Sequence, residues 1–296
     1  MSIDTIGIIG AGELGQALGH VLEKTGLRVL YYDKQDDRTT TASIGDVVGS
    51  CPVLFLCVPS WANAEVAKSI TKHANPQHLP LVITLSKGVE SKFVTMDQVL
   101  QKNLPPGTPF GLLYGPMIAS ELIAHQMGAG VLALTDRQYG EPVKTMLAKA
   151  RIYIELSDDI HGTAVSGVLK NVYAMAFGMA DGMKLGANAR GKLATLVLRE
   201  MKHILASAHA NAETAEGLAG LGDLLATGTS ETSFNYRVGK SIAEGIADEK
   251  VKSEGLVTLK ELEHVVNLSE CPVAQSLNKL VYHYGEPKEL QALLEA

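Results

Sequence analysis

The amino-acid sequence predicts an α/β protein in which a doubly wound parallel sheet, residues 1–156, is followed by an all-α domain, residues 157–296. Two observations predict the first part. Apolar segments alternate with amphipathic helical segments, and a glycine-rich turn joins the first apolar segment to the first helix. One observation predicts the second part: after Leu156 helical periodicity continues without a strand pattern. A length of 296 residues is typical of two domains.

Seven apolar segments in the first part have the length and composition of strands. Most are continuous runs of β-branched residues or leucine, which is typical of strands that a parallel sheet buries on both faces. We predict strands at Thr5–Ile9, Arg28–Tyr32, Val53–Val58, Leu81–Leu85, Phe110–Tyr114, Val131–Leu134 and Ile152–Glu155. Between them, the spacing of apolar residues predicts helices at Leu14–Lys24, Ala62–His73 and Pro142–Lys149.

The second part is predicted to contain helices only. A long helix is expected at Ile160–Met183, and Asn188 is expected to N-cap a second one at Ala189–His209. A glycine-rich turn region, Gly217–Gly228, precedes four further helices, at Tyr236–Gly245, Leu259–Asn267, Val273–His283 and Lys288–Leu294. Three glycines recur every four residues and are interpreted as one helix face that another segment or a ligand approaches closely: Gly178, Gly182 and Gly186.

Composition excludes several classes of function. The net charge of −6 argues against a nucleic-acid or membrane-surface partner. No apolar stretch is long enough to insert into a membrane, and the first apolar run lacks the basic residues that precede it in a signal peptide. Cys51, Cys57 and Cys271 form no CxxC pair, and neither they nor the histidines have the spacing of metal ligands. We therefore expect a cytoplasmic protein with reduced cysteines and no metal.

The turn after the first strand has the pattern GxGxxG. Gly10 permits a tight turn, Gly12 lets the backbone approach a pyrophosphate, and Gly15 lets the helix pack closely on the strand. The N-terminus of the following helix offers free N–H groups to an anion. Because the motif follows a strand and opens a helix, the sequence predicts a dinucleotide site here.

The end of the second strand indicates which dinucleotide binds. Asp33 lies where a carboxylate binds the ribose hydroxyls of NAD and repels the additional phosphate of NADP. Lys34 and Arg38 are near enough to reverse this preference. We therefore expect NAD or NADP, with NAD favoured by Asp33.

A lysine within an apolar helix indicates the chemistry. Lys170 is surrounded by apolar residues at helical spacing, and a lysine there is costly to bury unless it is paired or functional. Reduction of a ketone needs a hydride donor and a group that protonates or stabilises the developing alkoxide. Lys170 fits that role, and Asp223, which follows a glycine turn, can orient it or cap the next helix.

An ordered set of motifs extends over nearly the full chain. It comprises Val58-Pro59-Ser60, Ser86-Lys87-Gly88, Gly115-Pro116 with Ala119 and Glu121, Leu169-Lys170-Asn171-Val172, Gly186-Ala187-Asn188-Ala189-Arg190, Arg199-Glu200-Met201, Gly217-Leu218-Ala219-Gly220-Leu221-Gly222-Asp223-Leu224 and Glu254-Gly255. With these motifs the chain resembles the NAD(P)-dependent glycerol-3-phosphate dehydrogenase family. The resemblance implies a Rossmann-type first domain, a helical catalytic domain and a homodimer.

The resemblance also implies an activity and roles for individual residues. The activity is the interconversion of dihydroxyacetone phosphate and sn-glycerol 3-phosphate, which supplies glycerolipid synthesis. Lys170 would donate or accept the proton, Lys87 would polarise the carbonyl, and Asp223 would orient Lys170. The implied substrate contacts are Lys87, Gly115, Met117, Lys170, Asn171, Asp223, Ser233, Phe234 and Asn235. The implied cofactor contacts are Gly10, Gly12, Glu13, Leu14, Gly15, Asp33, Pro59, Lys87, Ala119, Phe234 and Glu254.

The chain departs from the family pattern at three positions. Leu14 stands where the family usually has an aromatic residue, and Met117 stands where it has Ser or Thr. Phe234 replaces an arginine that contacts the substrate phosphate and the cofactor. Arg237, if its segment is helical, and Arg190 are the candidates to replace that arginine.

Two alternatives remain open. The first is a related reductase that acts on another small carbonyl compound, because of Phe234 and Met117. Ketopantoate and 3-hydroxyacid dehydrogenases share the architecture but favour an asparagine four residues after the lysine, whereas Ala174 stands there in this chain. The second is a non-catalytic cofactor sensor, which would be expected to lose Lys170, Lys87 or Asp223, all of which are present.

Overall fold

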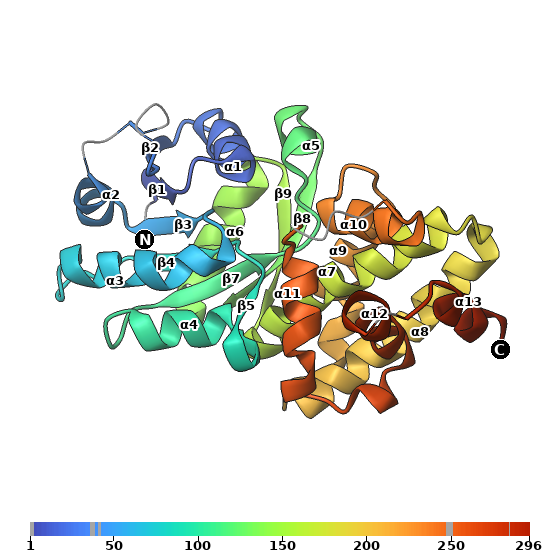
Figure 1. Cartoon of the computed structure of the whole chain (residues 1–296). Helices are drawn as coiled ribbons and strands as arrows, with labels where there is room; N and C mark the ends of the chain where they lie inside the picture. The colour runs from blue at the N-terminus through green and yellow to red at the C-terminus, as the bar shows by residue number, and fades with distance from the viewer. Residues whose placement is uncertain (1–2, 36–38, 41–42, 247–250, 284) are drawn as a thin grey trace. The chain divides into compact units, whose positions relative to one another are not determined.

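The chain forms two compact units (Figure 1). The computed structural model describes residues 3–35, 39–40, 43–246, 251–283 and 285–296; Arg38 lies outside these ranges. The first unit comprises Met1–Lys87 and Thr95–Ile160, and the second comprises Gly88–Val94 and His161–Ala296. The sequence-based division at residue 156 had placed Gly88–Val94 in the first domain.

A seven-stranded sheet forms the centre of the first unit. The strand order is β2-β1-β3-β4-β7-β8-β9. The strands are β1 (Thr5–Ile9), β2 (Arg28–Tyr32), β3 (Val53–Leu56), β4 (Leu81–Thr84), β7 (Phe110–Tyr114), β8 (Gly128–Leu134) and β9 (Ile152–Ser157). Two short strands, β5 (Val89–Glu90) and β6 (Val94–Thr95), pair separately. Each of the seven segments predicted as a strand is therefore a strand of this sheet.

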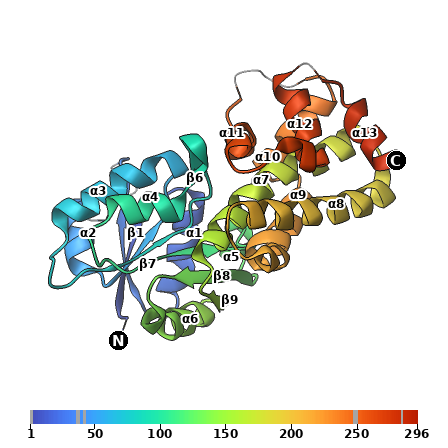
Figure 2. The ribbon, with the colours of Figure 1, turned by 90° about the horizontal axis from the view of Figure 1, so that it is seen from below.

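Helices cover both faces of the sheet. Because side chains alternate along a strand, Val53 and Phe55 face one apolar core while Leu54 and Leu56 face the other. The first core includes residues of α1 (Glu13–Glu23), α5 (Ala119–Ile123) and α6 (Gly140–Lys149), and the second includes residues of α2 (Ile44–Ser50), α3 (Asn63–His73) and α4 (Met96–Asn103). Figure 2 shows α2, α3 and α4 on one side of the strands and α6 on the other. The doubly wound arrangement is confirmed.

The sheet is not parallel throughout. β7 and β8 pair antiparallel, whereas the pairs before them and β8–β9 are parallel. The connection from β7 to β8 spans residues 115–127 and contains the five-residue α5. It is long enough for a parallel crossover, so the antiparallel direction of β8 does not follow from the length of the connection. The predicted doubly wound sheet is therefore parallel apart from the β7–β8 pair.

Three helices of this unit, α2, α4 and α5, were missed, although the caps of α2 and α4 are visible in the sequence. Ser43 caps α2 by accepting from Asp46 N. Thr95 and Gln98 form a capping box at the start of α4. The spacing of Ser or Thr and an acceptor three residues later is the usual signal for a helix start, and it would have predicted both.

The second unit is built around α7 (Ile160–Gly182), whose residues from Gly162 to Ala180 are all buried. A helix that is apolar on all sides has to be surrounded by others. The surrounding helices are α8 (Gly186–Ser207), α9 (Asp223–Gly228), α10 (Phe234–Ala243), α11 (Glu254–Glu261), α12 (Pro272–Tyr282) and α13 (Lys288–Glu295). The expected all-α second domain is confirmed.

Three local predictions in this unit were wrong. Asn188 is not an N-cap, because α8 already begins at Gly186 after Leu185. Gly186, with φ +82°, lies in the joint between the two helices and not on the face of α7. The region Gly217–Gly228 is helical rather than a turn, with a π-helical turn at Leu218–Gly222 followed by α9.

The other two glycines of that repeat bring α7 against α10. A Cβ atom on Gly178 would lie 1.9 Å from Tyr236 O, and one on Gly182 would lie 2.9 Å from Lys240 O. Conversely, a Cβ atom on Gly239 of α10 would lie 2.0 Å from Met175 O. The alternative of close helix packing, rather than ligand approach, therefore explains Gly178 and Gly182.

A buried carboxylate joins three helices of the second unit. Glu200 of α8 is 4% exposed and accepts hydrogen bonds from Tyr173 Oη of α7 at 2.9 Å and from Ala274 N of α12 at 3.0 Å. It also accepts from Val273 N, so it caps α12 from outside that helix. Burial raises the pKa of Glu200 above its ordinary value, although these hydrogen bonds act in the opposite direction.

We expect Glu200 to stabilise the fold less at neutral pH than at acidic pH. Because its folded-state pKa lies above the unfolded value, its contribution is fully present below the unfolded pKa and is lost as the pH rises through the folded pKa. Thermal unfolding of the wild type and of Glu200→Gln across mildly acidic to neutral pH measures this. The Tm of the wild type minus that of the variant should fall with rising pH; a rise would contradict the prediction.

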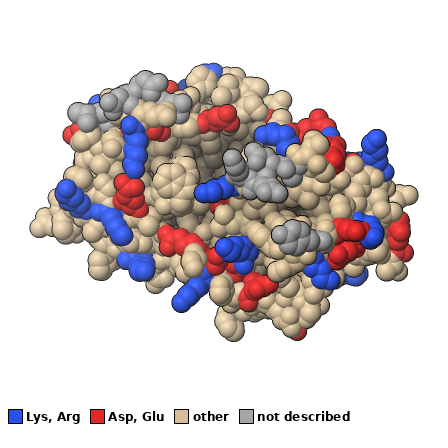
Figure 3. Space-filling model, in the orientation of Figure 1, with Lys and Arg blue, Asp and Glu red and all other residues tan. Residues whose placement is uncertain are grey.

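On the face that Figure 3 shows, basic and acidic side chains are interspersed over both units. Among the described residues, no helix is long and apolar enough to cross a membrane.

Candidate active site

The glycine loop joins β1 to α1 and leaves an open anion site. A Cβ atom on Gly10, where φ is +96°, would lie 2.7 Å from the Cys57 carbonyl carbon, and one on Gly15 would lie 2.0 Å from Gly10 O. Both positions therefore require glycine. Gly12 differs, because nothing lies within 4 Å of the position of its Cβ atom. Gly12 is also the N-cap of α1 and supplies no side-chain cap, so the first N–H groups of the helix receive no acceptor from the cap residue, as at helix N-termini that bind anions.

Asp33 is fixed beside this loop. Its carboxylate accepts hydrogen bonds from Ala11 N at 2.6 Å and from Gln35 N at 3.0 Å. Lys34, which follows it, forms an ion pair with Glu65 of α3 at 3.0 Å. The carboxylate is thus held next to the glycine loop, while Lys34, one of the two cations that could reverse the cofactor preference, already has an acidic partner.

Predicted residues at the ends of the neighbouring strands also lie together. Lys87 Nζ, beyond the end of β4, donates to Gly115 O at 3.3 Å and lies 5.3 Å from the centre of the Tyr114 ring. Met117 and Ala119 are partly buried and pack against the core of the first unit. Of the remaining predicted cofactor contacts, Glu13 is exposed in the first turn of α1, Leu14 is partly buried, and Pro59 is exposed after β3.

The second unit contains a buried ion pair. Lys170 Nζ of α7 lies 3.5 Å from Asp223 Oδ1 at the start of α9, and the two side chains are 10% and 3% exposed. Burying one of these charges without the other would be costly, so each stabilises the other in place. The sequence reasoning that singled out Lys170 and Asp223 therefore found two residues that the fold brings together.

Three helices meet beside this ion pair through asparagine side chains. Asn235 Nδ2 of α10 donates to Asn171 Oδ1 of α7 at 3.1 Å, and Gly255 N of α11 donates to Asn235 Oδ1 at 3.1 Å. Asn235 therefore positions Asn171, the neighbour of Lys170. Glu254 is half-buried in the first turn of α11, next to Gly255.

The residues around the position of the missing arginine have their own partners. Ser233 is the N-cap of α10 and accepts from Tyr236 N. Phe234 is 49% exposed, and the guanidinium carbon of Arg237 lies 5.8 Å from the centre of its ring. Arg237 Nη1 donates to Thr232 O at 2.7 Å and to Glu231 O at 3.2 Å. Because an arginine has five donors, these two bonds through one nitrogen leave Nε and Nη2 to offer.

Arg190 lies in a different part of the unit. Its Nη1 atom is 3.4 Å from Asp181 Oδ2, which also accepts from Tyr236 Oη at 2.7 Å. Asp181 follows Lys170 by three turns of α7, which at about 1.5 Å per residue is on the order of 16 Å. The two candidate arginines therefore have different partners: Arg237 bonds to the segment just before α10, whereas Arg190 pairs with Asp181 near the end of α7.

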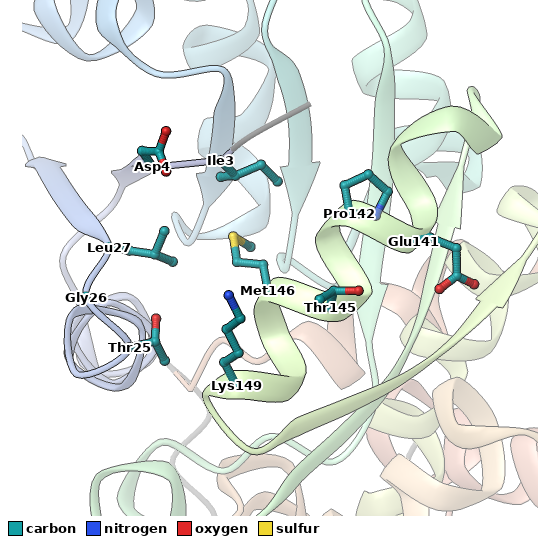
Figure 4. Close-up of a pocket in the computed structure, with 10 residues that line it drawn as sticks. All are labelled: Ile3, Asp4, Thr25, Gly26, Leu27, Glu141, Pro142, Thr145, Met146 and Lys149. Atoms are coloured by element: carbon teal, nitrogen blue, oxygen red, sulfur yellow. The ribbon is translucent and has the colours of Figure 1, made fainter.

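A separate cavity of 530 Å³ lies at the amino end of β1, away from the glycine loop at its carboxyl end (Figure 4). Figure 4 shows Met146 and Lys149 of α6 directed toward the turn of Thr25 and Leu27. Ligands of open α/β sheets bind at the carboxyl ends of the strands. This cavity therefore does not belong to the candidate site.

Comparison with known proteins finds family models that match segments in both units of the chain. The family model of the NAD-dependent glycerol-3-phosphate dehydrogenase N-terminus matches residues 39–140, and that of the C-terminus matches residues 159–292. The model of the D-isomer specific 2-hydroxyacid dehydrogenase NAD-binding domain matches residues 1–74. Glycerol-3-phosphate dehydrogenase, NAD(P)+, of Alcanivorax borkumensis is 31% identical over 96% of this chain and 91% of its own length.

Comparison with solved structures also finds a glycerol-3-phosphate dehydrogenase. The crystal structure of glycerol-3-phosphate dehydrogenase from Coxiella burnetii matches with a TM-score of 0.88 and 26% identity, over 99% of each chain. A ketopantoate reductase from Ralstonia eutropha matches with a TM-score of 0.61 and 14% identity, over 99% of this chain and 100% of its own, which is a likeness of fold alone.

Proposed function

Because the chain belongs to the NAD-dependent glycerol-3-phosphate dehydrogenase family, we propose that it interconverts dihydroxyacetone phosphate and sn-glycerol 3-phosphate. The chain is an NAD(P)-dependent oxidoreductase with a small-molecule substrate. The observation that carries the proposal is the buried ion pair of Lys170 with Asp223, since a ketone reductase needs an acid held where water is excluded. In this proposal the first domain, 1–156, binds the cofactor, and the second domain, 157–296, supplies the catalytic residues.

The reaction needs one group that supplies the hydride and other groups that protonate or stabilise the carbonyl oxygen. Gly12 and the N-terminus of α1 would hold the nicotinamide cofactor, which would supply the hydride for the C2 carbonyl of the substrate. Lys170 donates a proton to the resulting alkoxide, and in the reverse direction it accepts the proton from the hydroxyl. Asp223 keeps the Lys170 ammonium in position, and Asn171 donates a hydrogen bond to the substrate. Lys87 adds positive charge that favours the developing alkoxide.

The cofactor preference follows from Asp33. The carboxylate beside Ala11 N accepts from the ribose hydroxyls, and its charge repels a 2′-phosphate. Glu65 neutralises Lys34, so Lys34 does not attract that phosphate. Gly12 and the N-terminus of α1 bind the pyrophosphate. These contacts favour NADH over NADPH.

We expect kcat/KM with NADH to exceed that with NADPH by about tenfold or more, which corresponds to roughly 1.4 kcal/mol of discrimination. Asp33→Ser should remove most of this ratio because it removes the repelling charge. Asp46→Ser, in α2, is the matched control and should leave the ratio unchanged. Equal or higher efficiency of the wild type with NADPH would contradict the role of Asp33.

Arg237 is the better replacement for the missing arginine. In the substrate, only a few covalent bonds separate the phosphorus from the carbonyl carbon that Lys170 serves. Arg190, paired with Asp181 three helical turns from Lys170, is too distant. Arg237 lies over the ring of Phe234, and Asn235, next to Phe234, bonds to Asn171. We therefore assign phosphate binding to Arg237 with its remaining donors.

Substitutions at this position should change KM more than kcat, because the phosphate is not the reacting group. Arg237→Ala should raise KM for dihydroxyacetone phosphate by about tenfold, in keeping with the roughly 1.5–3 kcal/mol of a hydrogen bond to a charged group. Phe234→Arg should lower KM. Arg190→Gln is the control and should leave KM unchanged. Steady-state kinetics of the three variants would contradict the assignment if Arg190→Gln raised KM and Arg237→Ala did not.

A different small carbonyl substrate remains the second candidate, and Phe234 and Met117 are the observations that favour it. If Phe234→Arg brought no gain on the phosphate ester, Phe234 would mark another substrate. The proposal also includes a homodimer, a cytoplasmic location and a role in glycerolipid synthesis.

A further inference from the structure

The single tryptophan of the chain is an exposed aromatic residue at the carboxyl edge of the sheet. Trp61 is 72% exposed, more than most large apolar residues of the protein. It lies in the helical turn η2 (Ser60–Ala62), between β3 and α3. Its neighbours in the chain, Ser60 and Ala62, are both buried. The turn is therefore anchored while the indole ring faces outward.

Hydrogen bonds fix this turn. Asn63 is fully buried, and its Nδ2 atom donates to Ser60 O at 3.2 Å. Thr84 Oγ1 of β4 donates to Asn63 Oδ1 at 2.9 Å. The turn is thus bound to the neighbouring strand, and Trp61 is held on a rigid support rather than on a loose loop. Within the described part of the chain, its ring packs against no other aromatic ring.

The turn borders the dinucleotide site on two sides. Before it, Val58 and Cys57 contact the glycine loop: a Cβ atom on Gly10 would lie 2.8 Å from Val58 Cγ1. After it, Glu65 follows Trp61 by one helical turn, so the two side chains share a face. Glu65 pairs with Lys34, which follows the ribose-binding carboxylate of Asp33.

We propose that Trp61 is the stacking platform for the adenine ring of the nicotinamide dinucleotide. Every base has a π-face, and stacking on an aromatic side chain contributes to binding without hydrogen-bond readout. Because the ring is already exposed and held in place, little conformational entropy is lost when a base stacks on it. The resemblance to known dehydrogenases assigns Pro59 to the cofactor and assigns nothing to Trp61.

The position favours adenine over nicotinamide. The pyrophosphate lies at Gly12, and Asp33 binds the ribose on the adenosine side of it. The base attached to that ribose therefore lies near the pair of Lys34 with Glu65, on the side where Trp61 is exposed. The inference rests on the proposed function, since it requires the dinucleotide to occupy the glycine loop.

Because the chain has one tryptophan, its tryptophan fluorescence, excited at a wavelength that the nine tyrosines do not absorb, reports on position 61 alone. AMP and ADP-ribose, which carry adenine and accept no energy from tryptophan, are titrated into the wild-type protein. Both should quench the emission with saturation, whereas nicotinamide mononucleotide should not. Saturable quenching by nicotinamide mononucleotide without quenching by AMP would overturn the assignment to adenine.

Binding to variants tests the same point without the tryptophan signal. The Kd of NADH, followed by its own emission, should rise by about tenfold in Trp61→Ala and stay within about threefold in Trp61→Phe. Tyr153→Ala, at an exposed aromatic residue of β9, is the control and should leave the Kd unchanged. An unchanged Kd in Trp61→Ala overturns the inference and leaves the proposed function intact; failure of the wild type to bind NADH overturns both.

Discussion

Replacement of Lys170 by methionine should abolish turnover while NADH still binds. The loss should be on the order of a hundredfold or more, because general acid–base catalysis by one positioned group contributes about that much. Methionine has a similar length and keeps the apolar packing of α7, but it has no proton to donate. Lys192→Met, on the exposed side of α8, is the matched control and should turn over like the wild type. Steady-state rates and the NADH Kd of both variants measure this.

The Lys170→Met substitution is also expected to lower the stability of the fold. Removal of Lys170 leaves the buried Asp223 carboxylate without its cation, which costs about 3–5 kcal/mol when a buried pair is broken. The double variant Lys170→Met with Asp223→Asn removes both charges and should recover stability but not activity. Near-wild-type turnover in a folded variant without Lys170 would remove this residue from the mechanism.

Gly239→Ala should destabilise the second unit strongly. The added Cβ atom would lie 2.0 Å from Met175 O, so α10 has to move away from α7. Overpacking of this kind costs roughly 1–3 kcal/mol, and more where backbone has to move. For a protein of this size that corresponds to a fall in Tm of about 2–12 °C. The movement also separates Asn235 from Asn171, so the remaining folded protein should have a lower kcat.

Gly191 provides the matched control. It is also a helical glycine, but nothing lies within 4 Å of the position of its Cβ atom. Gly191→Ala should stabilise the fold by roughly 0.5–1 kcal/mol through helix propensity alone. If thermal unfolding showed equal effects of the two substitutions, close packing of α7 and α10 would not explain the glycine repeat.

Most of the fold follows from local patterns in the sequence. Most strands of the large sheet are continuous apolar runs, and the glycine loop meets the conformational requirement of a tight turn between β1 and α1. The direction of β8 does not follow, because an apolar run shows that a segment is a strand but not which way it pairs with its neighbour. α2 and α4 were missed because they are short, and only their caps mark them.

The site was predicted unevenly for a similar reason. Lys170 attracts attention because a charge within an apolar helix needs a partner, and Asp223 follows a glycine-rich segment. The partner of Arg190 depends on how α7 and α8 pack, which periodicity does not reveal. Trp61 was missed because an aromatic residue in a sequence is more often buried than exposed, and its exposure appears only in the folded chain.

The most direct test of the proposed function compares two substrates that differ only in the phosphate. The wild-type protein is assayed with NADH and either dihydroxyacetone phosphate or unphosphorylated dihydroxyacetone, by following the oxidation of NADH. We predict that kcat/KM is at least about tenfold higher for the phosphate ester, because Arg237 binds the phosphate by a charge-assisted contact. Equal or faster reduction of dihydroxyacetone, or no reduction of the ester, would contradict the proposed substrate.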